Sequence, residues 1–366
     1  MRLAVVSQIQ PGSLRAHAIN VIKTAGGFAR LGHDVRLYTL APAADAHGAD
    51  PARTYHESHV HWVTCPGEPD DESFGRWAAR TILADQCDAV YGRNFWAPLL
   101  TSACGLPSIV ETHAHIGVEN GLLDQTLAAT RATPAMRAII TIAPILRDHF
   151  IERGAEPGRV HVVPDGVDLE LFTRHAPSPF ESPGPNIVYS GHLYDYKGIP
   201  TVIEAAALLP RASFHLVGGL PEDIARHQRT ITSRGLTNVH LHGLLAHAQV
   251  PPFVQHADVL LLPPSAREVS KDWTSPVKLG EYLASGPPIV ASSIPALVRA
   301  VPESMFIWFE PDDATSLARA ISLALESACD ATGRASRLAL ARRLSYTARA
   351  SRILDAGRLS LRGMAA

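Results

Sequence analysis

The sequence has few cysteines and no long apolar run. Its four cysteines lie far apart and form no CxxC pair (Cys65, Cys87, Cys104 and Cys329). This spacing argues against a disulfide framework or a cysteine-rich zinc centre and is typical of a reducing compartment. No stretch reaches the ~18 consecutive apolar residues that cross a bilayer. The N-terminal MRLAVVSQ has too short an apolar run for a secretory signal. We therefore expect a cytoplasmic protein with no transmembrane segment. Any contact with a membrane would be peripheral.

Neither sign of charge dominates. The formal net charge of −2 gives no basis for expecting a nucleic-acid partner. Apolar residues make up 46% and charged residues 19% of the chain, which is typical of a globular protein with a sizeable core. The 18 histidines are scattered, and only the pairs His113/His115 and His240/His242 are close enough to suggest shared ligands. We expect no bound metal and no cofactor. The 366 residues predict about two domains.

Short apolar runs alternate with stretches of helical spacing along the whole chain. In the first half we predict strands at Leu3–Ser7, Asp34–Thr39, Ala89–Gly92, Ser108–Thr112, Ala138–Ile142 and Val160–Val163. In the second half we predict strands at Ile187–Ser190, Phe214–Val217, Val239–His242, Val259–Leu262 and Ile289–Ala291. Leu317–Ser327 and Arg334–Leu354 are predicted as the closing helices. Strands that alternate with helices in this way indicate parallel sheets.

A proline-rich segment separates the two halves. Residues 173–186 read TRHAPSPFESPGPN, and four prolines in 14 residues favour a linker. We therefore predict an α/β fold with two doubly wound, Rossmann-like domains, one over residues 1–172 and one over 187–344, joined by a hinge at 173–186. Ligands in such folds bind at the carboxyl ends of the strands, and a cleft between two domains is a common substrate site.

The segment SPVKLGEYLASGPPIVA, Ser275–Ala291, carries the most information about function. Ser275 and Pro276 predict a helix start, where free backbone N–H groups and the helix dipole favour an anion. Lys278 adds a positive charge, and Glu281 stands one turn later, where its carboxylate can accept hydrogen bonds from hydroxyls. A phosphate holder beside a hydroxyl acceptor suits a sugar nucleotide, although an ordinary capped helix has the same residues.

Other candidate donor-site residues follow the predicted C-terminal strands. Lys197 lies in the loop after Ile187–Ser190 and can reach a phosphate, while a solvated loop lysine is the alternative. Gly191 and His192 follow the same strand, and the histidine either donates to a phosphate, stacks on the sugar or has no role. Gly218 and Gly243 end later strands, where they either let a nucleotide base approach the backbone or form tight turns.

The N-terminal half offers a separate set of polar residues at strand ends. Gly12 follows the first strand in a short loop that a ligand can touch, although a plain turn fits as well. His113 follows the strand Ser108–Thr112 and can polarise a sugar hydroxyl or a leaving oxygen, with Glu111 and His115 as nearby alternatives. Arg93 and Asn94 end another strand and either bind an acceptor or pair with Glu111, and His115 is a further candidate for binding the acceptor.

Taken in order, these segments resemble glycosyltransferases of family 4, which have the GT-B fold with two domains facing a cleft. The resemblance covers nearly the whole chain, through the segments ARLGHDVRLYT, IVETHAH, IITIAPILRDHF, VHVVPDGVDLELF, IVYSGHLYDYKGIPTVIEAAALL, FHLVGG, NVHLHGLL, HADVLLLPPS and SPVKLGEYLASGPPIVAS. It implies a metal-independent retaining transferase that uses a nucleotide diphosphate sugar bound mainly to the C-terminal domain. It also implies that a helix in residues 345–366 crosses back to the N-terminal domain, which binds the acceptor.

The resemblance assigns roles to individual positions. Lys197 would bind the diphosphate, Glu281 would hold the ribose, and His113 would lie near the transferred sugar. The residues implied near the phosphates and the sugar are Gly12, Ser275, Pro276, Val277 and Lys278. Two positions depart from the family pattern, because His192 stands where an arginine is usual and Trp273 replaces the first glutamate of a Glu-x7-Glu motif. Glu268 and Asp272 lie in the same loop as possible replacements for that glutamate.

Two other functions stay open at this stage. A nucleotide-sugar 2-epimerase shares the fold, but it needs catalytic carboxylates, and Asp165, Glu111 and Glu119 form no convincing arrangement in the sequence. A nucleotide-sugar-binding protein without turnover is the non-enzymatic alternative, and the two departures at His192 and Trp273 are its basis. The sequence does not decide whether the acceptor is a small metabolite, a growing glycan or a lipid-linked sugar.

Overall fold

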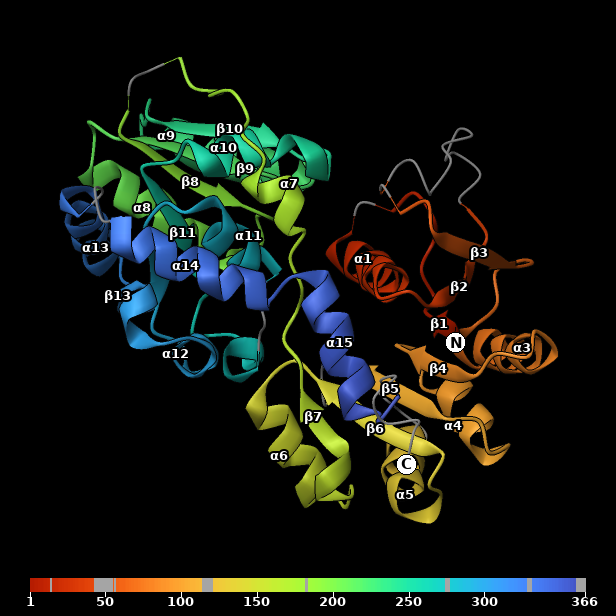
Figure 1. The fold of residues 1–366 in the computed structure, drawn as a ribbon. Coiled ribbons are helices and arrows are strands. Elements are labelled where there is room, and N and C mark those ends of the chain that lie inside the picture. The colour runs from red at the N-terminus through yellow and green to blue at the C-terminus, as the bar shows by residue number, and fades with distance from the viewer. Residues whose placement is uncertain are drawn as a thin grey trace. The chain divides into compact units, whose positions relative to one another are not determined.

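The computed structural model describes residues 1–366 except residues 14, 43–54, 56, 114–120, 182–183, 274–276, 328–330 and 360–366. The chain folds into two compact units, each built on its own sheet (Figure 1). The N-terminal unit comprises Met1–Gly166 together with Ser345–Ala366, and the C-terminal unit comprises Val167–Leu344.

The N-terminal unit has a seven-stranded parallel sheet in the order β3-β2-β1-β4-β5-β6-β7. Its strands are β1 (Arg2–Val6), β2 (Asp34–Leu40), β3 (Val60–Cys65), β4 (Ala89–Gly92), β5 (Ser108–Thr112), β6 (Met136–Thr141) and β7 (Val160–Val162). In register, Leu3 of β1 pairs with Val35 on one side and with Ala89 on the other. The strand order reverses between β1 and β4, which is the switch point where ligands bind in open α/β sheets.

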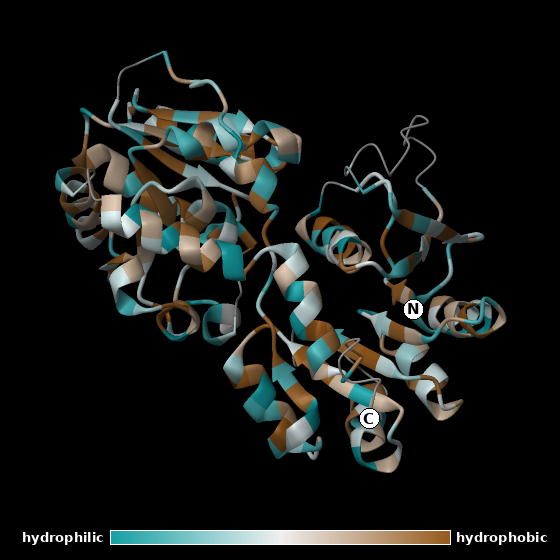
Figure 2. Cartoon of the chain, in the orientation of Figure 1, coloured by the Kyte–Doolittle hydropathy of each residue, from teal (hydrophilic) through white to brown (hydrophobic). Residues whose placement is uncertain are grey.

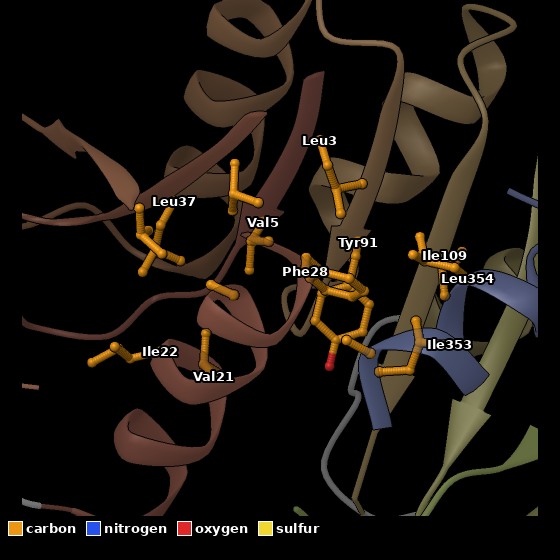
Figure 3. Close-up of a cluster of buried hydrophobic side chains, with 14 of the residues drawn as sticks. Leu3, Val5, Val21, Ile22, Phe28, Leu37, Tyr91, Ile109, Ile353 and Leu354 are labelled. Atoms are coloured by element: carbon orange, nitrogen blue, oxygen red, sulfur yellow. The ribbon is translucent and has the colours of Figure 1, made fainter. Parts of the chain in front are cut away.

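Two helices from opposite ends of the sequence share the core of this unit. Figure 3 shows Leu3 and Val5 of β1 in one apolar cluster with side chains of α1 and α15, including Phe28 and Ile353. Gly27 permits this close packing, because a Cβ there would collide with the Tyr346 carbonyl. The helices of the unit are α1 (Ala16–Arg30), α3 (Asp71–Ala84), α4 (Trp96–Ala103), α5 (Leu122–Ala132), α6 (Pro144–Glu152) and α15 (Tyr346–Ala356).

The C-terminal unit has a six-stranded parallel sheet in the order β10-β9-β8-β11-β12-β13. Its strands are β8 (Asn186–Ser190), β9 (Ser213–Val217), β10 (Val239–Gly243), β11 (Val259–Leu262), β12 (Ile289–Ser292) and β13 (Ile307–Phe309). The order reverses between β8 and β11, so this sheet also has a switch point.

The helices of the C-terminal unit are α7 (Leu169–Thr173), α8 (Ile199–Leu208), α9 (Pro221–Ser233), α10 (Pro251–Gln255), α11 (Val277–Ser285), α12 (Pro295–Ala300), α13 (Ala314–Glu326) and α14 (Ala331–Arg343). Among these helices, α8 and α13 contribute mainly apolar side chains to the core, and α11 is buried over most of its described length. Figure 2 shows the apolar residues concentrated in the strands, as expected for parallel sheets buried on both faces. Among the described residues, no helix is both long and apolar enough to span a bilayer.

The predicted α/β fold with two doubly wound sheets is confirmed. Every predicted strand is present, with ends displaced by at most two residues. The short edge strands β3 and β13 were not predicted. The predicted closing helix Arg334–Leu354 was wrong, because it is two helices that break at Leu344 and restart where Ser345 caps α15 by accepting a hydrogen bond from the Ala348 N–H at 3.3 Å.

The unit boundaries differ from the predicted ones. The chain passes between units at Gly166–Val167 and at Leu344–Ser345, not within the predicted hinge at 173–186. Val167 and Phe172 belong to the C-terminal core because both are buried there. The described part of the proline-rich segment packs on the same unit, where the Phe180 ring lies 4.5 Å from the ring of His215.

Candidate functional site

The candidate donor site lies at the carboxyl end of β8, beside helix α11. The Tyr282 hydroxyl on α11 accepts a hydrogen bond from the Ser190 backbone N–H at 2.8 Å, which ties the helix to the last residue of the strand. Gly191 follows with φ of +135°, and a Cβ at this position would collide with the Lys278 ammonium. A glycine is therefore needed for Lys278 to lie against the strand end.

Lys278 is held by a tyrosine that the sequence analysis did not single out. Its ammonium donates to the Tyr189 hydroxyl at 2.8 Å, and that hydroxyl donates to the His192 carbonyl at 2.7 Å. Burial lowers the pKa of Lys278 well below its ordinary value, and the positive charge of Lys197 lowers it further. Tyr189 was read only as part of a buried strand, because its hydroxyl partners come from other elements.

Lys197 supplies a second positive charge near Lys278. It ends the short 3-10 helix Asp195–Lys197, and its ammonium lies 5.0 Å from the ring centre of Tyr196. Burial lowers the pKa of Lys197, while the carboxylate of Glu268 opposes this shift. Within the described parts of the chain, neither Lys197 nor Lys278 forms an ion pair with a carboxylate. Two neighbouring, partly desolvated ammonium groups without such partners form a site suited to an anion.

Glu281 follows Lys278 by one turn of α11. The side chain is almost buried, and its Oε1 lies 3.0 Å from the Nε2 of His247. His247 belongs to the 3-10 helix His247–Gln249 and was not predicted, because no local pattern links it to α11. Val277 begins the described part of α11 and is partly buried. Ser275 and Pro276, the predicted cap and first helical residue, lie outside the described residues.

The predicted glycines stand at the ends of adjacent strands. The Gly218 N–H donates to the Gly243 carbonyl at 2.8 Å, and a Cβ on Gly218 would collide with the Gly191 carbonyl. The close approach of the Gly191 carbonyl thus requires a glycine at position 218. Gly243 has φ of +70° and open space around its Cβ position.

His192 stacks in a short ladder of rings beside this site. Its ring centre lies 5.0 Å from that of Tyr194, with 11° between the planes, and Tyr194 lies 5.3 Å from Tyr196. The His192 carbonyl is already occupied by Tyr189. The imidazole therefore stands next to the anion site, stacked on Tyr194 and held through its carbonyl by Tyr189.

A second polar cluster lies at the ends of β4 and β5 in the N-terminal unit. The Nε2 of His113 is 2.7 Å from Glu111 Oε1 and 3.8 Å from Asp165 Oδ1. Arg93 Nε is 4.0 Å from the same Glu111 oxygen, so Arg93 and Glu111 do pair. Gly12 forms the turn after β1 with φ of +93°, and His115 lies outside the described residues.

Asn94 does not fit its predicted acceptor role. Its side chain is buried, and its Oδ1 accepts from the Ala97 N–H at 3.0 Å. Its Nδ2 donates to the Asp71 Oδ1 at 2.7 Å and to the Asp71 backbone carbonyl at 3.1 Å. Asn94 therefore lies just before α4, accepts from the first turn of that helix and joins it to α3. In the described residues, no three His, Cys, Asp or Glu side chains are grouped so that they could hold a metal ion.

Two family models match the chain in succession. Residues 19–171 match Glycosyltransferase Family 4, and residues 184–327 match Glycosyl transferases group 1. The chain belongs to the family 4 type of glycosyltransferases. It is a nucleotide-sugar-dependent enzyme with the GT-B fold, as the resemblance implied.

Individual relatives are distant in sequence but similar along most of their length. D-inositol 3-phosphate glycosyltransferase 1 of Catenulispora acidiphila is 25% identical over 351 residues, covering 82% of this chain and 81% of the relative. The Anabaena protein Alr3699/HepE, solved in complex with UDP, is 17% identical with a TM-score of 0.74, covering 97% of this chain and 99% of that one. Sucrose-phosphate synthase from Thermosynechococcus elongatus is 17% identical with a TM-score of 0.73, covering 97% of each chain.

Proposed function

We propose that this glycosyltransferase moves a sugar from a nucleoside diphosphate donor to an acceptor hydroxyl, with retention at the anomeric carbon and without a metal ion. The observation that carries the proposal is the pair Lys197 and Lys278 at the carboxyl end of β8, since their ammonium groups can hold a diphosphate. The structural neighbour solved with UDP makes UDP the first diphosphate to test.

The two lysines would act mainly on the leaving group. When the bond between the anomeric carbon and the phosphate oxygen breaks, negative charge develops on the diphosphate. Preorganised positive charge at that point stabilises the transition state more than the ground state. Tyr189 contributes by fixing Lys278, because its hydroxyl accepts from the ammonium and is itself anchored on the His192 carbonyl.

The arrangement of carboxylates favours a single step on one face of the sugar. A double displacement needs a carboxylate nucleophile, but Glu111 is fully enclosed by Arg349, Tyr91 and His113. Glu281 is almost buried beside His247. We propose that the acceptor oxygen bonds to the anomeric carbon from the side of the departing phosphate. A phosphate oxygen then takes the acceptor's proton.

We propose residues that take over from the arginine and the glutamate that this chain lacks. His192 stands beside the anion site in place of an arginine, and it would add positive charge only when protonated. For the missing glutamate at Trp273, Glu268 is the stronger substitute, because its carboxylate acts electrostatically on Lys197. We propose that Glu268 binds a hydroxyl of the donor sugar.

The experiment that tests the proposal follows donor hydrolysis and transfer in the presence of EDTA. The purified protein is incubated with UDP-, GDP- and ADP-glucose, and proton NMR records the anomer of the first sugar released. The α-anomer from an α-linked donor supports retention, whereas the β-anomer, or a strict need for divalent metal, contradicts the proposal. Arg234→Ala is the control for Lys197→Ala, because Arg234 pairs with Glu204 on the surface of the same unit.

A further inference from the structure

A buried charged cluster in the N-terminal unit encloses Glu111. Arg349 and Glu111 are 0% and 1% exposed. The Arg349 Nη2 donates to Glu111 Oε2 at 2.6 Å, and the Tyr91 hydroxyl donates to the same oxygen at 2.5 Å. Burial alone would raise the pKa of Glu111, but the charge of Arg349 and the hydrogen bond from His113 hold that pKa well below its ordinary value. Glu111 is therefore a carboxylate that can only accept hydrogen bonds.

This ionisation state fixes the proton on His113. The Nε2 of His113 is 2.7 Å from Glu111 Oε1, and an acceptor-only oxygen at this distance requires a proton on that nitrogen. Asp165 Oδ1, which accepts from the Asn20 amide, lies 3.8 Å from the same nitrogen and further favours the proton there. Nδ1 is then the ring nitrogen that can face a ligand, and no hydrogen bond to it is seen within the described residues.

We infer that Glu111 and Arg349 are positioning residues that hold His113 protonated on Nε2 and keep Nδ1 for the substrate. This inference rests on the proposed function, in which His113 lies near the transferred sugar. The general reason is that the second nitrogen of a functional imidazole is commonly fixed by a carboxylate, which sets both the tautomer and the ring orientation.

The C-terminal helix α15 is part of this support. Arg349 lies 238 positions after Glu111, and its Nε donates to the Pro164 carbonyl at 3.0 Å, next to Asp165. Its Nη1 donates to Thr24 on α1 at 3.1 Å. One guanidinium thus braces Glu111 and also the backbone beside Asp165, the two carboxylates that face His113.

The first test needs no variant of the cluster and no turnover. Two-bond ¹H–¹⁵N spectra of the histidine-labelled full chain report which imidazole nitrogen is protonated, and the His113 signals are assigned by their loss in His113→Gln. The spectra are recorded at a pH at which the ring is neutral, and a proton on Nε2 is the expected result. A neutral ring protonated on Nδ1, or exchange between both tautomers, would overturn the inference.

The second test separates positioning from structural support. Glu111→Gln keeps the shape of the side chain, but the amide can donate hydrogen bonds as well as accept them. We therefore expect His113 to populate both tautomers. We expect kcat to fall about 10- to 100-fold, the range known for carboxylates that orient metal-binding histidines, with a much smaller change in the donor KM. An unchanged tautomer and an unchanged kcat would overturn the inference.

Glu57→Gln is the matched control. Glu57 is 5% exposed in the same unit and pairs with Lys23 at 3.3 Å and Arg30 at 2.8 Å. This substitution removes a comparable buried carboxylate. We therefore expect it to lower the stability of the fold and to leave the His113 tautomer and kcat unchanged. If Glu111→Gln fails to fold, the His113 tautomer measured in the unsubstituted protein still tests the inference. If no donor turns over while the proton is found on Nε2, the proposed function fails and the positioning of His113 stands.

Discussion

Replacing Arg349 by methionine tests whether the buried cluster stabilises the N-terminal unit as the structure indicates. Methionine keeps an unbranched chain but removes the charge and the donors to Glu111, Pro164 and Thr24. Glu111 then stays buried, with Arg93 4.0 Å from its other oxygen. Removing one partner of a buried ion pair costs about 3–5 kcal/mol, so we expect a loss of this size in the free energy of unfolding.

The double variant Arg349→Met/Glu111→Leu separates the ion pair from packing. Replacing both partners by apolar side chains removes the uncompensated charge, and such replacements are often close to neutral. We expect the double variant to regain about 2 kcal/mol or more relative to Arg349→Met. His113 loses its carboxylate partner in the double variant, so this experiment addresses stability and not activity.

The assay is urea unfolding of the full chain, followed by tryptophan fluorescence and far-UV circular dichroism. Arg349→Met should also recover stability as the pH falls, because a buried carboxylate without its cation has a raised pKa and binds a proton more readily in the folded state. A loss below about 1 kcal/mol in Arg349→Met, or a double variant no more stable than the single one, would refute the reasoning.

Three further predictions concern single residues. Lys278→Met should raise the melting temperature without ligand, because it removes a desolvated charge beside Lys197, and differential scanning calorimetry checks this. Burial lowers the pKa of His215 to about 4. As the pH falls, His215 is therefore protonated in the unfolded chain before it is protonated in the folded one. The free energy of unfolding decreases between pH 6.5 and 4. His215→Phe should flatten this part of a denaturation-versus-pH series by up to about 3 kcal/mol. Asn94→Ala should cost about 1–2 kcal/mol in urea unfolding and leave the acceptor KM unchanged. A raised acceptor KM would instead restore its binding role.

Much of the fold could be predicted because parallel strands buried on both faces appear as continuous apolar runs. The edge strand β3, VHWVTC, was missed because several of its side chains are partly or fully exposed and no such run marks it. The three-residue strand β13 is too short to carry a pattern. The end of α14 was hidden because Leu344 and Ser345 do not interrupt the helical spacing of the sequence.

The sequence pointed to candidate site residues mainly where they stand in the loop after a strand or at the start of a helix. Lys197 and Lys278 were singled out from such positions. Tyr189 and His247 were not, because their roles depend on contacts with other elements. Arg349 could not be anticipated at all, since an arginine among the polar residues of a terminal helix is ordinarily a solvated side chain, and its partner lies 238 positions away.

The most direct measurement is calorimetric titration of the protein with UDP, GDP, ADP, TDP and CDP, repeated with Lys197→Ala, Lys278→Met and the surface control Arg234→Ala. We predict that one diphosphate binds, that each lysine variant weakens it at least about tenfold, since a charge-assisted hydrogen bond contributes 1.5–3 kcal/mol, and that the control binds like the wild type. Binding that is unchanged in both lysine variants, or no binding of any diphosphate, would contradict the assignment of the donor site.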